Sequence, residues 1–319
     1  MQPLLAISDL HTSFAGPDRK VSPAVNGISL SIQSGETLAL VGESGSGKSM
    51  TALSIMRLLP PSGTTTSGSI IFEGTDLTRL TDADMRRIRG SRISMVFQEP
   101  MTSLNPVLRI GDQLTEPLLL HRGMSKDEAV QQGITILNKV GIPSPEGRMR
   151  DYPHQLSGGM RQRVMIAMAL ACNPSLMIAD EPTTALDVTI QAQILDLISS
   201  LRESTGMGIL LITHDLGIVA GHSQHTCVMY AGQIVEEAPT RDLLTHPCHP
   251  YTRALLASLP QNTEPGTPLP AISGQAPDQK AGLPGCGFCD RCPTARPECR
   301  REPPPVTTVS PNHTVRCWL

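Results

Sequence analysis

One stretch of eight residues limits what this chain can fold into more than any other. Residues 42–49 read GESGSGKS and match the pattern G-x-x-x-x-G-K-[ST]. An apolar run at 36–42 predicts a strand before the stretch, and a helical pattern at 47–59 follows it. Glycines let the backbone fold so tightly that successive N–H groups point inward. The helix adds the positive end of its dipole, so the stretch predicts a binding site for phosphate groups.

Two side chains of this loop extend the prediction to a nucleoside triphosphate with Mg²⁺. Lys48 supplies a positive charge to the β- and γ-phosphates, and the Ser49 hydroxyl is a ligand for Mg²⁺. A chance match at the four fixed positions is expected in on the order of 1% of chains of this length. Because a strand precedes the loop and a helix follows it, we interpret the loop as functional.

Adjacent carboxylates, Asp180 and Glu181, end another apolar run at 176–180. Neighbouring side chains of a strand point in different directions. One carboxylate can therefore hold the Mg²⁺ shell while the other faces the γ-phosphate and its attacking water. The alternative is that these acidic residues cap a turn.

Gln98 and His214 end two further apolar runs, at 93–98 and 208–214. Either residue alone is more typical of an exposed or structural position. In parallel α/β sheets, however, ligands bind beyond the carboxyl ends of the strands. We therefore expect the phosphate loop, Gln98, Asp180 with Glu181, and His214 to share one edge of a sheet.

The composition fits a folded protein of about two domains. The chain has 319 residues, of which 39% are hydrophobic, and this suffices for a sizeable core. A formal charge of −3 and 3% aromatic residues argue against a nucleic-acid binder. No apolar run approaches the roughly 18–20 residues that cross a bilayer, and the first ten residues lack a secretory-signal pattern. We expect a cytoplasmic protein, with a membrane partner still open.

Residues 1–245 alternate apolar runs with helical patterns, which predicts a layered α/β domain. No strand is evident between about 100 and 150, so a helical insertion is expected there; Ser125 and Glu128 form a capping-box pattern within it. Residues 260–319 hold 12 of the 28 prolines, which predicts few regular elements and a boundary near 245–265. The predicted strands lie at 4–10, 36–42, 69–74, 93–98, 176–180, 208–214 and 226–236, and the predicted helices at 47–59, 108–120, 125–140, 158–172 and 188–204.

A second helix start has the features of an anion site. In LSGGMRQR at 156–163, Ser157 can cap the helix, and Gly158 and Gly159 leave its first N–H groups uncovered. One triphosphate site already exists at 42–49, so a second site needs the nucleotide of another molecule. An ordinary capped helix is the alternative.

The chain resembles the ATP-binding-cassette (ABC) ATPases, because LSGGMRQR is similar to their signature sequence. The other motifs are also present in the family's order: the phosphate loop, Gln98, Asp180 with Glu181, TTALD at 183–187 and THD at 213–215. Longer segments resemble the ATP-binding subunits of bacterial dipeptide/oligopeptide and nickel importers, including D-type subunits of dipeptide permeases. Those segments lie at 97–106, 152–170, 180–195 and 249–260.

The resemblance implies an α/β fold in two parts. An ABC-type P-loop ATPase domain at 1–245 would have a RecA-like core, an antiparallel β subdomain and a helical subdomain at about 100–172. A small Cys-rich C-terminal domain of the oligopeptide-transporter type would follow at 246–319. The implied activity is ATP hydrolysis coupled to peptide import.

The resemblance also assigns roles to the site residues. Asp180 would hold Mg²⁺ through its shell together with Ser49, and Glu181 would polarise the attacking water. His214 would contact the γ-phosphate, and Gln98 would sense Mg²⁺ and couple to the transmembrane subunits. Phe14 is the implied adenine-stacking residue, with His11 nearby. The implied nucleotide contacts are Gly42, Ser44, Gly45, Ser46, Gly47, Lys48, Ser49 and Met50, with Ser157, Gly158 and Gly159 reaching the ATP of a second cassette.

Partners follow from the same resemblance. A second ABC ATPase, either a paralogue or another copy, would close two ATP molecules in a head-to-tail pair. Two transmembrane permease subunits and a periplasmic peptide-binding protein would complete the importer, which would place this chain on the cytoplasmic face of the inner membrane as a peripheral subunit. Nickel or glutathione as cargo, or a soluble ABC ATPase outside transport, are the alternatives.

The C-terminal cysteines follow the spacing C-x₂-C-x₂-C-x₆-C-x₁₇-C, which is typical of a metal centre. Four thiolates suit Zn²⁺ and an iron–sulfur cluster equally well. The importer resemblance favours a [4Fe–4S] cluster in this segment, with Zn²⁺ as the alternative. Its pattern matches Cys286, Cys292, Cys299 and Cys317, while Cys289 is extra and could replace one of them. No redox role is implied, and a structural clip for the proline-rich segment is preferred.

Overall fold

The computed structural model describes residues 2–15, 21–98, 103–184, 186–259, 270–277 and 284–318. The chain divides into two compact units. Unit 1 contains Met1–Ile32, Thr37–Thr78 and Ile212–Leu319, and unit 2 contains Gln33–Glu36 and Arg79–Leu211. Residues 99–102, Ala185 and residue 260 belong to segments that carry the family resemblance, and they lie outside the described residues.

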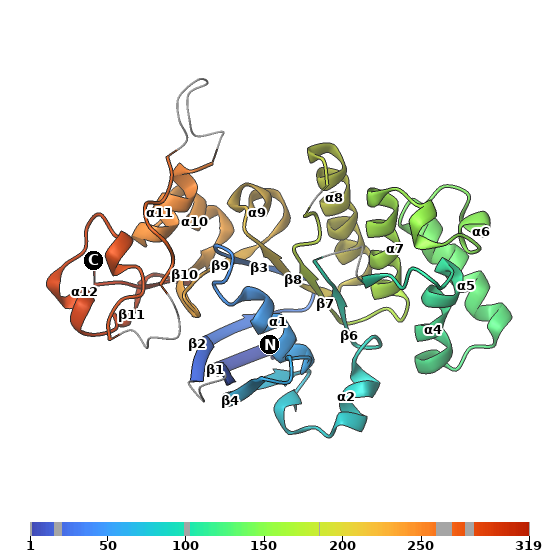
Figure 1. Ribbon diagram of the computed structural model, residues 1–319, viewed down its shortest axis with the longest axis horizontal. Coiled ribbons are helices and arrows are strands. Elements are labelled where there is room, and N and C mark those ends of the chain that lie inside the picture. The colour runs from blue at the N-terminus through green and yellow to red at the C-terminus, as the bar shows by residue number, and fades with distance from the viewer. Residues whose placement is uncertain are drawn as a thin grey trace. The chain divides into compact units, whose positions relative to one another are not determined.

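An antiparallel sheet of four strands, in the order β2-β1-β4-β5, forms one layer of unit 1. Side chains at the start of β1 alternate, with Leu5 and Ile7 buried and Ser8 exposed, as expected when one face of a sheet covers a core. The ladder shifts register after Ile7, where Asp9 has a φ of 47°. The strands are β1 (Leu5–Ala15), β2 (Val21–Ile32), β4 (Gly63–Phe72) and β5 (Thr75–Asp76), with β1, β2 and β4 side by side in Figure 1.

A second group of strands in unit 1 includes β3, the strand that precedes the phosphate loop. Strand β3 (Thr37–Val41) is buried along its whole length and pairs in parallel with β9 (His225–Tyr230). Strand β10 (Gln233–Pro239) is antiparallel to β9, and the hairpin of β11 (Val306–Ser310) and β12 (His313–Arg316) continues from β10. The helices of unit 1 are α1 (Lys48–Met56), α9 (Leu216–His222), α10 (Thr240–Thr245), α11 (Pro250–Ala257) and α12 (Pro297–Arg301), with a 3₁₀ turn, η5, at Cys289–Arg291.

The core of unit 1 joins these strands to the C-terminal segment. Tyr251 and Phe288 are fully buried in one hydrophobic cluster with Val41, Val228 and Tyr230. The three rings pack with centroid distances of 4.6 Å for Tyr230–Tyr251 and 5.3 Å for Phe288 against each tyrosine. Large aromatic side chains dominate the energetics of such cores, so the C-terminal segment contributes to the stability of unit 1.

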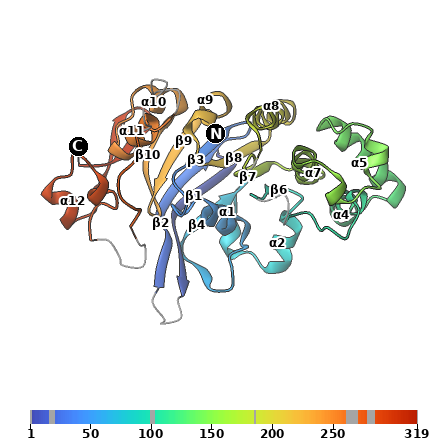
Figure 2. The same ribbon diagram turned by 45° about the horizontal axis from the view of Figure 1, so that its top comes forward.

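Unit 2 combines parallel strands with a helical layer. Strand β6 (Ile93–Val96) pairs in parallel with β7 (Leu176–Asp180), and β8 (Gly208–Thr213) leads the chain back into unit 1. Helices α4 and α5 pack on each other and on α7 (Figure 2). The helices are α2 (Asp82–Ile88), α4 (Ile110–Arg122), α5 (Lys126–Lys139), α6 (Pro145–Arg148), α7 (Gly158–Leu170) and α8 (Val188–Thr205).

Most predicted elements are confirmed to within a few residues. Each of the five predicted helices corresponds to one helix, and the described part of 100–150 is helical without strands. The predicted capping box at α5 is present, because Ser125 and Glu128 exchange side-chain-to-backbone hydrogen bonds.

The prediction of one strand over 226–236 is wrong, because the segment is the β9–β10 hairpin. Ala231 and Gly232 form its turn with φ values of 46° and 82°. A two-residue hairpin turn with positive φ at both central residues is a type I′ geometry, for which Asn-Gly is the usual signal. Ala-Gly does not carry that signal, and the apolar runs on both sides read as continuous.

Candidate functional site

The phosphate loop lies between β3 and α1, against two neighbouring strands. A Cβ atom at Gly42 would lie 2.1 Å from the carbonyl oxygen of Met229 on β9. At Gly47, where φ is 109°, it would lie 2.4 Å from the carbonyl oxygen of Ala24 on β2. Both distances exclude any side chain, so these glycines fix the path of the loop through backbone contact.

Polar groups of the loop are arranged for an anion. Helix α1 begins at Lys48 after Gly47, which offers no side-chain cap for the first N–H groups. The Ser46 hydroxyl is buried and has no hydrogen-bond partner. Lys48 is 5% exposed, and its ammonium group donates to the carbonyl oxygens of Gly42 at 2.8 Å and Glu43 at 3.0 Å. A buried hydroxyl without a partner is costly, and a phosphate oxygen would satisfy it.

The loop opens into a cavity of about 420 Å³, a volume typical of small-molecule sites. Phe14 lines this cavity, and its ring passes over Gly63, where a Cβ would lie 2.7 Å from Phe14 Cε1. His11, the neighbouring candidate, instead hydrogen-bonds to Asp9 at 3.1 Å. The lining residues are Phe14, Ser22, Pro23, Ala24, Glu43, Ser44, Gly45, Ser46, Tyr230, Ala231, Ala276 and Pro277.

In unit 2, the ends of the parallel strands β6 and β7 bring two predicted residues together. Gln98 Nε2 donates to Glu181 Oε2 at 2.9 Å, and the Thr184 hydroxyl donates to the same oxygen at 3.0 Å. Asp180, the last residue of β7, is 4% exposed, whereas Glu181 is partly exposed and has a φ of 46°. The two carboxylates therefore occupy different environments, as strand alternation predicts.

The predicted cap at the start of α7 is confirmed. Ser157 accepts a hydrogen bond from the backbone N–H of Met160 at 3.3 Å. Gly158 is exposed, and Gly159 packs against α8, where a Cβ would lie 2.9 Å from Ile190 Cγ2. The helix start presents backbone N–H groups rather than side chains at its surface.

His214 is exposed directly after β8. Its neighbour Asp215 caps α9 by accepting from the backbone N–H of Gly217 at 2.7 Å. His214 and the phosphate loop belong to unit 1, whereas Gln98, Asp180, Glu181 and the α7 start belong to unit 2. Of the predicted strand-end residues, Gln98 and Glu181 are those that meet within one unit.

Sequence reasoning missed a polar network behind the phosphate loop. Arg291 forms two hydrogen bonds with the Glu43 carboxylate and one with the Tyr230 hydroxyl. The Tyr251 hydroxyl accepts the backbone N–H of Glu43 at 2.9 Å. Burial raises the pKa of both tyrosines, and the hydrogen bonds to Glu43 raise the pKa of Arg291. Only one feature of the sequence indicated this network: Glu43 lies in the phosphate loop and Arg291 lies in the cysteine motif.

All five C-terminal cysteines line one cavity, with Phe288 and Trp318 among the other lining residues. The backbone N–H of Cys286 donates to the Cys299 carbonyl oxygen at 2.7 Å, which joins two parts of the motif. Burial raises the pKa of Cys286 to about 11, with further contributions from nearby thiols. Burial likewise raises the pKa of Cys289. Without a cation these groups are protonated thiols; a bound metal would stabilise the thiolates.

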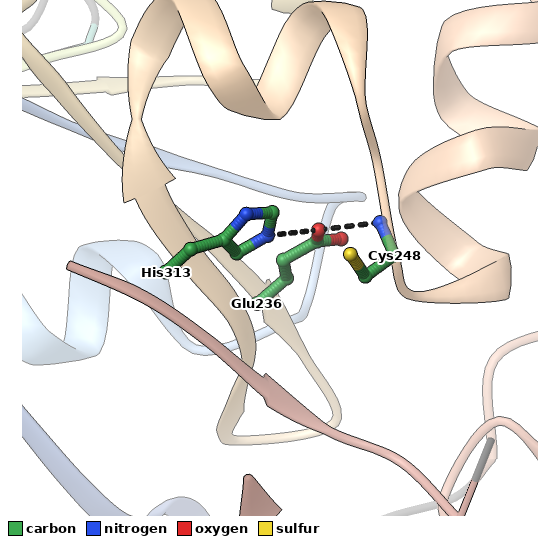
Figure 3. Close-up of side chains that lie close together, drawn as sticks. All are labelled: Glu236, Cys248 and His313. Atoms are coloured by element: carbon green, nitrogen blue, oxygen red, sulfur yellow. Dashed lines mark hydrogen bonds and ion pairs between the residues drawn. The ribbon is translucent and has the colours of Figure 1, made fainter. Parts of the chain in front are cut away.

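A separate cluster of ligand-type residues lies where β10 meets β12 (Figure 3). Glu236 is 1% exposed, and its carboxylate accepts from His313 Nε2 at 2.8 Å and from the backbone N–H groups of Cys248 at 2.6 Å and His249 at 2.9 Å. Glu236, Cys248 and His313 are spaced closely enough for one metal ion. Because three donors already satisfy the carboxylate, we interpret the cluster as a structural latch for the C-terminal hairpin.

Comparisons with known proteins agree along the whole chain. A model of the ABC transporter family matches residues 25–184, and a model of the oligopeptide/dipeptide transporter C-terminal region matches residues 235–299. The dipeptide transport ATP-binding protein DppD of Bacillus subtilis (strain 168) is 51% identical over 320 residues, covering 100% of this chain and 95% of DppD. The oligopeptide transport ATP-binding protein OppD of Salmonella typhimurium is 47% identical over 315 residues, covering 99% of this chain and 93% of OppD.

A solved structure extends the comparison to the fold. The ATP-binding cassette MJ0796, in a dimeric post-hydrolysis state bound to ADP and Pi, is 29% identical with a TM-score of 0.67. The match covers 74% of this chain and 99% of MJ0796. Among the helices that the structure describes, none combines the length and hydropathy of a membrane span.

Proposed function

The chain belongs to the ATP-binding proteins of ABC transporters, and on this premise we propose that it powers the import of dipeptides or oligopeptides. It binds ATP and hydrolyses it as the ATP-binding subunit of a peptide importer. The observation that carries this function is the loop at 42–49, whose uncapped helix start, buried Lys48 and partnerless Ser46 hydroxyl form a phosphate cradle. Full-length identity of about half to DppD and OppD supports the cargo class.

The mechanism assigns the cradle to the β- and γ-phosphates. Lys48 would leave the carbonyl oxygens of Gly42 and Glu43 and donate to phosphate oxygens in their place. Ser49, Gln98 and Asp180 are suited to hold Mg²⁺, which neutralises phosphate charge when bound. Phe14, at the cavity wall, would stack on adenine, and Met50 on α1 would add a contact near the phosphates. Positioning and charge stabilisation supply most of the catalysis in such sites.

Glu181 is the proposed base that orients the attacking water. Its Oε2 accepts from Gln98 Nε2 and from the Thr184 hydroxyl, so two donors hold the carboxylate at the strand end. A carboxylate held in this way can orient a water molecule and accept its proton. His214 is assigned to the γ-phosphate.

We further infer that two cassettes enclose each nucleotide. The α7 start with Ser157, Gly158 and Gly159 has the chemistry of an anion site, and it would act on the ATP held by a partner's phosphate loop. A paralogous ATPase is the proposed partner. The complete importer would add two permease subunits and a peptide-binding protein, with this chain attached to the cytoplasmic face of the membrane. The proposed domain division remains 1–245 and 246–319.

The cysteine cavity is proposed to hold a [4Fe–4S] cluster bound by Cys286, Cys292, Cys299 and Cys317. The donor set fits, because all five cysteines line one cavity. Zn²⁺ bound by four thiolates is the alternative, because the same donor set suits both centres.

Three measurements test these assignments separately: nucleotide binding, co-purification from membranes and metal analysis. Wild-type protein should bind Mg-ATP and co-purify from membranes with permease subunits, whereas Lys48→Ala should retain its fold and lose nucleotide binding. Co-purification with ribosomes or DNA in place of permeases would contradict the transport role.

For the cysteine centre, iron and acid-labile sulfide analysis with absorbance near 400 nm should report a cluster, and zinc alone would contradict it.

A further inference from the structure

We propose that Arg291, inside the cysteine motif, is a positioning residue of the nucleotide site. Arg291 neutralises Glu43 in the phosphate loop, and it holds residues 272–277 as one wall of the nucleotide cavity. This inference rests on the proposed ATP-binding function of the loop. Its consequence is that the C-terminal segment sets the affinity for nucleotide.

The contact between Arg291 and Glu43 is bidentate. Nη1 donates to Glu43 Oε2 at 2.8 Å, and Nη2 donates to Oε1 at 3.0 Å. The Arg291 side chain is 7% exposed, and that of Glu43 is 28% exposed. Parallel charge-assisted bonds of this kind fix geometry as well as charge. The pair is therefore an organised contact rather than a mobile surface pair.

Further contacts hold the guanidinium group in place. The Tyr230 hydroxyl accepts from Nη1 at 3.1 Å, and the guanidinium carbon lies 5.8 Å and 5.9 Å from the ring centroids of Tyr230 and Phe288. The backbone of Arg291 ends the turn η5, between Cys289 and Cys292. The cysteine segment thus places the positively charged guanidinium group of Arg291 against the phosphate loop.

Glu43 lies between the Arg291 guanidinium group and the phosphate-binding residue Lys48, and it contacts both. The carbonyl oxygen of Glu43 accepts from Lys48 Nζ at 3.0 Å, and its backbone N–H donates to the Tyr251 hydroxyl. Glu43 also lines the cavity where a triphosphate is expected. An unpaired carboxylate there would repel the nucleotide, so a neutralising partner is a requirement of the site.

Arg291 also organises the cavity wall formed by the C-terminal segment. Its Nε donates to the carbonyl oxygen of Ser273 at 3.0 Å, and Nη2 donates to that of Ile272 at 3.3 Å. Ala276 and Pro277, a few residues further on, line the same cavity as Phe14 and the phosphate loop. One side chain therefore positions both the loop and the wall.

The test uses equilibrium binding of the fluorescent nucleotide mant-ATP with Mg²⁺ to the full chain. Arg291→Gln should raise the Kd about tenfold, which corresponds to about 1.4 kcal/mol. Adding Glu43→Gln in that background removes the unpaired carboxylate and should return the Kd to within about threefold of wild type. A purely structural role of Arg291 predicts no such rescue. Wild-type affinity in Arg291→Gln, or no rescue by Glu43→Gln, would overturn the proposal.

Three controls separate this inference from the proposed function. Lys48→Ala should abolish binding, and Arg300→Gln, which removes an exposed pair with Asp290, should leave it unchanged. If the wild type itself binds no nucleotide, the proposed function fails; if it binds and Arg291→Gln is unaffected, only this inference fails. Ala276 is exposed, so Ala276→Trp should fold and yet block the cavity. Unchanged mant-ATP affinity in Ala276→Trp would show that residues 272–277 do not form a wall of the nucleotide site.

Discussion

The phosphate loop and the cysteine segment both bind charged groups in the proposed function, but different interactions hold them. Backbone contacts fix the loop, because Gly42 and Gly47 lie against carbonyl oxygens of β9 and β2. Side chains fix the cysteine segment, through Phe288 in the core and Arg291 on Glu43. The loop is organised for its ligand in advance, whereas burial raises the pKa of the Cys286 and Cys289 thiols in the segment.

The largest expected effect is on the side-chain anchor of the cysteine segment. Phe288→Ala removes a fully buried ring that packs on Tyr230 and Tyr251, and it should destabilise the protein by about 3–5 kcal/mol. Chemical denaturation of Phe288→Ala and the milder Phe288→Leu measures this loss. Equal stability of wild type and Phe288→Ala would show that the segment is not anchored by this ring.

The backbone-held loop should be intolerant of a single added methyl group. Gly42→Ala places a Cβ 2.1 Å from the Met229 carbonyl oxygen and should cost about 3 kcal/mol by overpacking, together with loss of nucleotide binding. Gly45→Ala is the matched control, because nothing lies within 4 Å and only its positive φ costs about 1 kcal/mol. Denaturation midpoints that rank the two variants in the opposite order would contradict the backbone account.

A pH effect is expected at His249, which caps α11 with its ring nitrogen. Burial lowers the pKa of His249 to about 4, below the ordinary value of 6.5. The contribution of neutral His249 to the free energy of unfolding is therefore fully present above about pH 6.5 and is lost as the pH falls toward 4. The loss amounts to about 2 kcal/mol at pH 5. Thermal unfolding at pH 7.5 and pH 5 should show a smaller pH response in His249→Asn than in wild type; identical responses would contradict this assignment.

The smallest effect is expected at the surface of the cysteine segment. Arg300 pairs with Asp290 at 2.6 Å, but both side chains are mostly exposed. Exposed pairs contribute about 0–1 kcal/mol, so Arg300→Gln should change the free energy of unfolding by less than that of any variant above. A large loss of stability or of bound metal in Arg300→Gln would show that this pair helps to hold the segment.

Sequence alone predicted the backbone-defined part of the molecule well. The phosphate loop, its flanking β3 and α1, the Ser125 capping box and the Ser157 cap depend on local patterns of a few residues. Local patterns also placed Gln98 and Glu181 at neighbouring strand ends, where they form a hydrogen bond.

The rest depends on contacts between distant residues, which no local pattern encodes. Glu43 and Arg291 are 248 positions apart, and Tyr251 lies 208 positions from Glu43. The short C-terminal elements escaped prediction for a related reason. Strand β12 exists because its partner β10 and the Glu236–His313 latch hold it, not because its four residues favour a strand.

A comparison of wild type with Glu181→Gln in the assembled transporter tests directly whether Glu181 orients the attacking water. Glu181→Gln should bind mant-ATP with Mg²⁺ about as tightly as wild type, while ATP turnover should fall by about 10²-fold or more. Loss of binding together with turnover would place Glu181 in the nucleotide cradle, and unchanged turnover would contradict its role in orienting the attacking water.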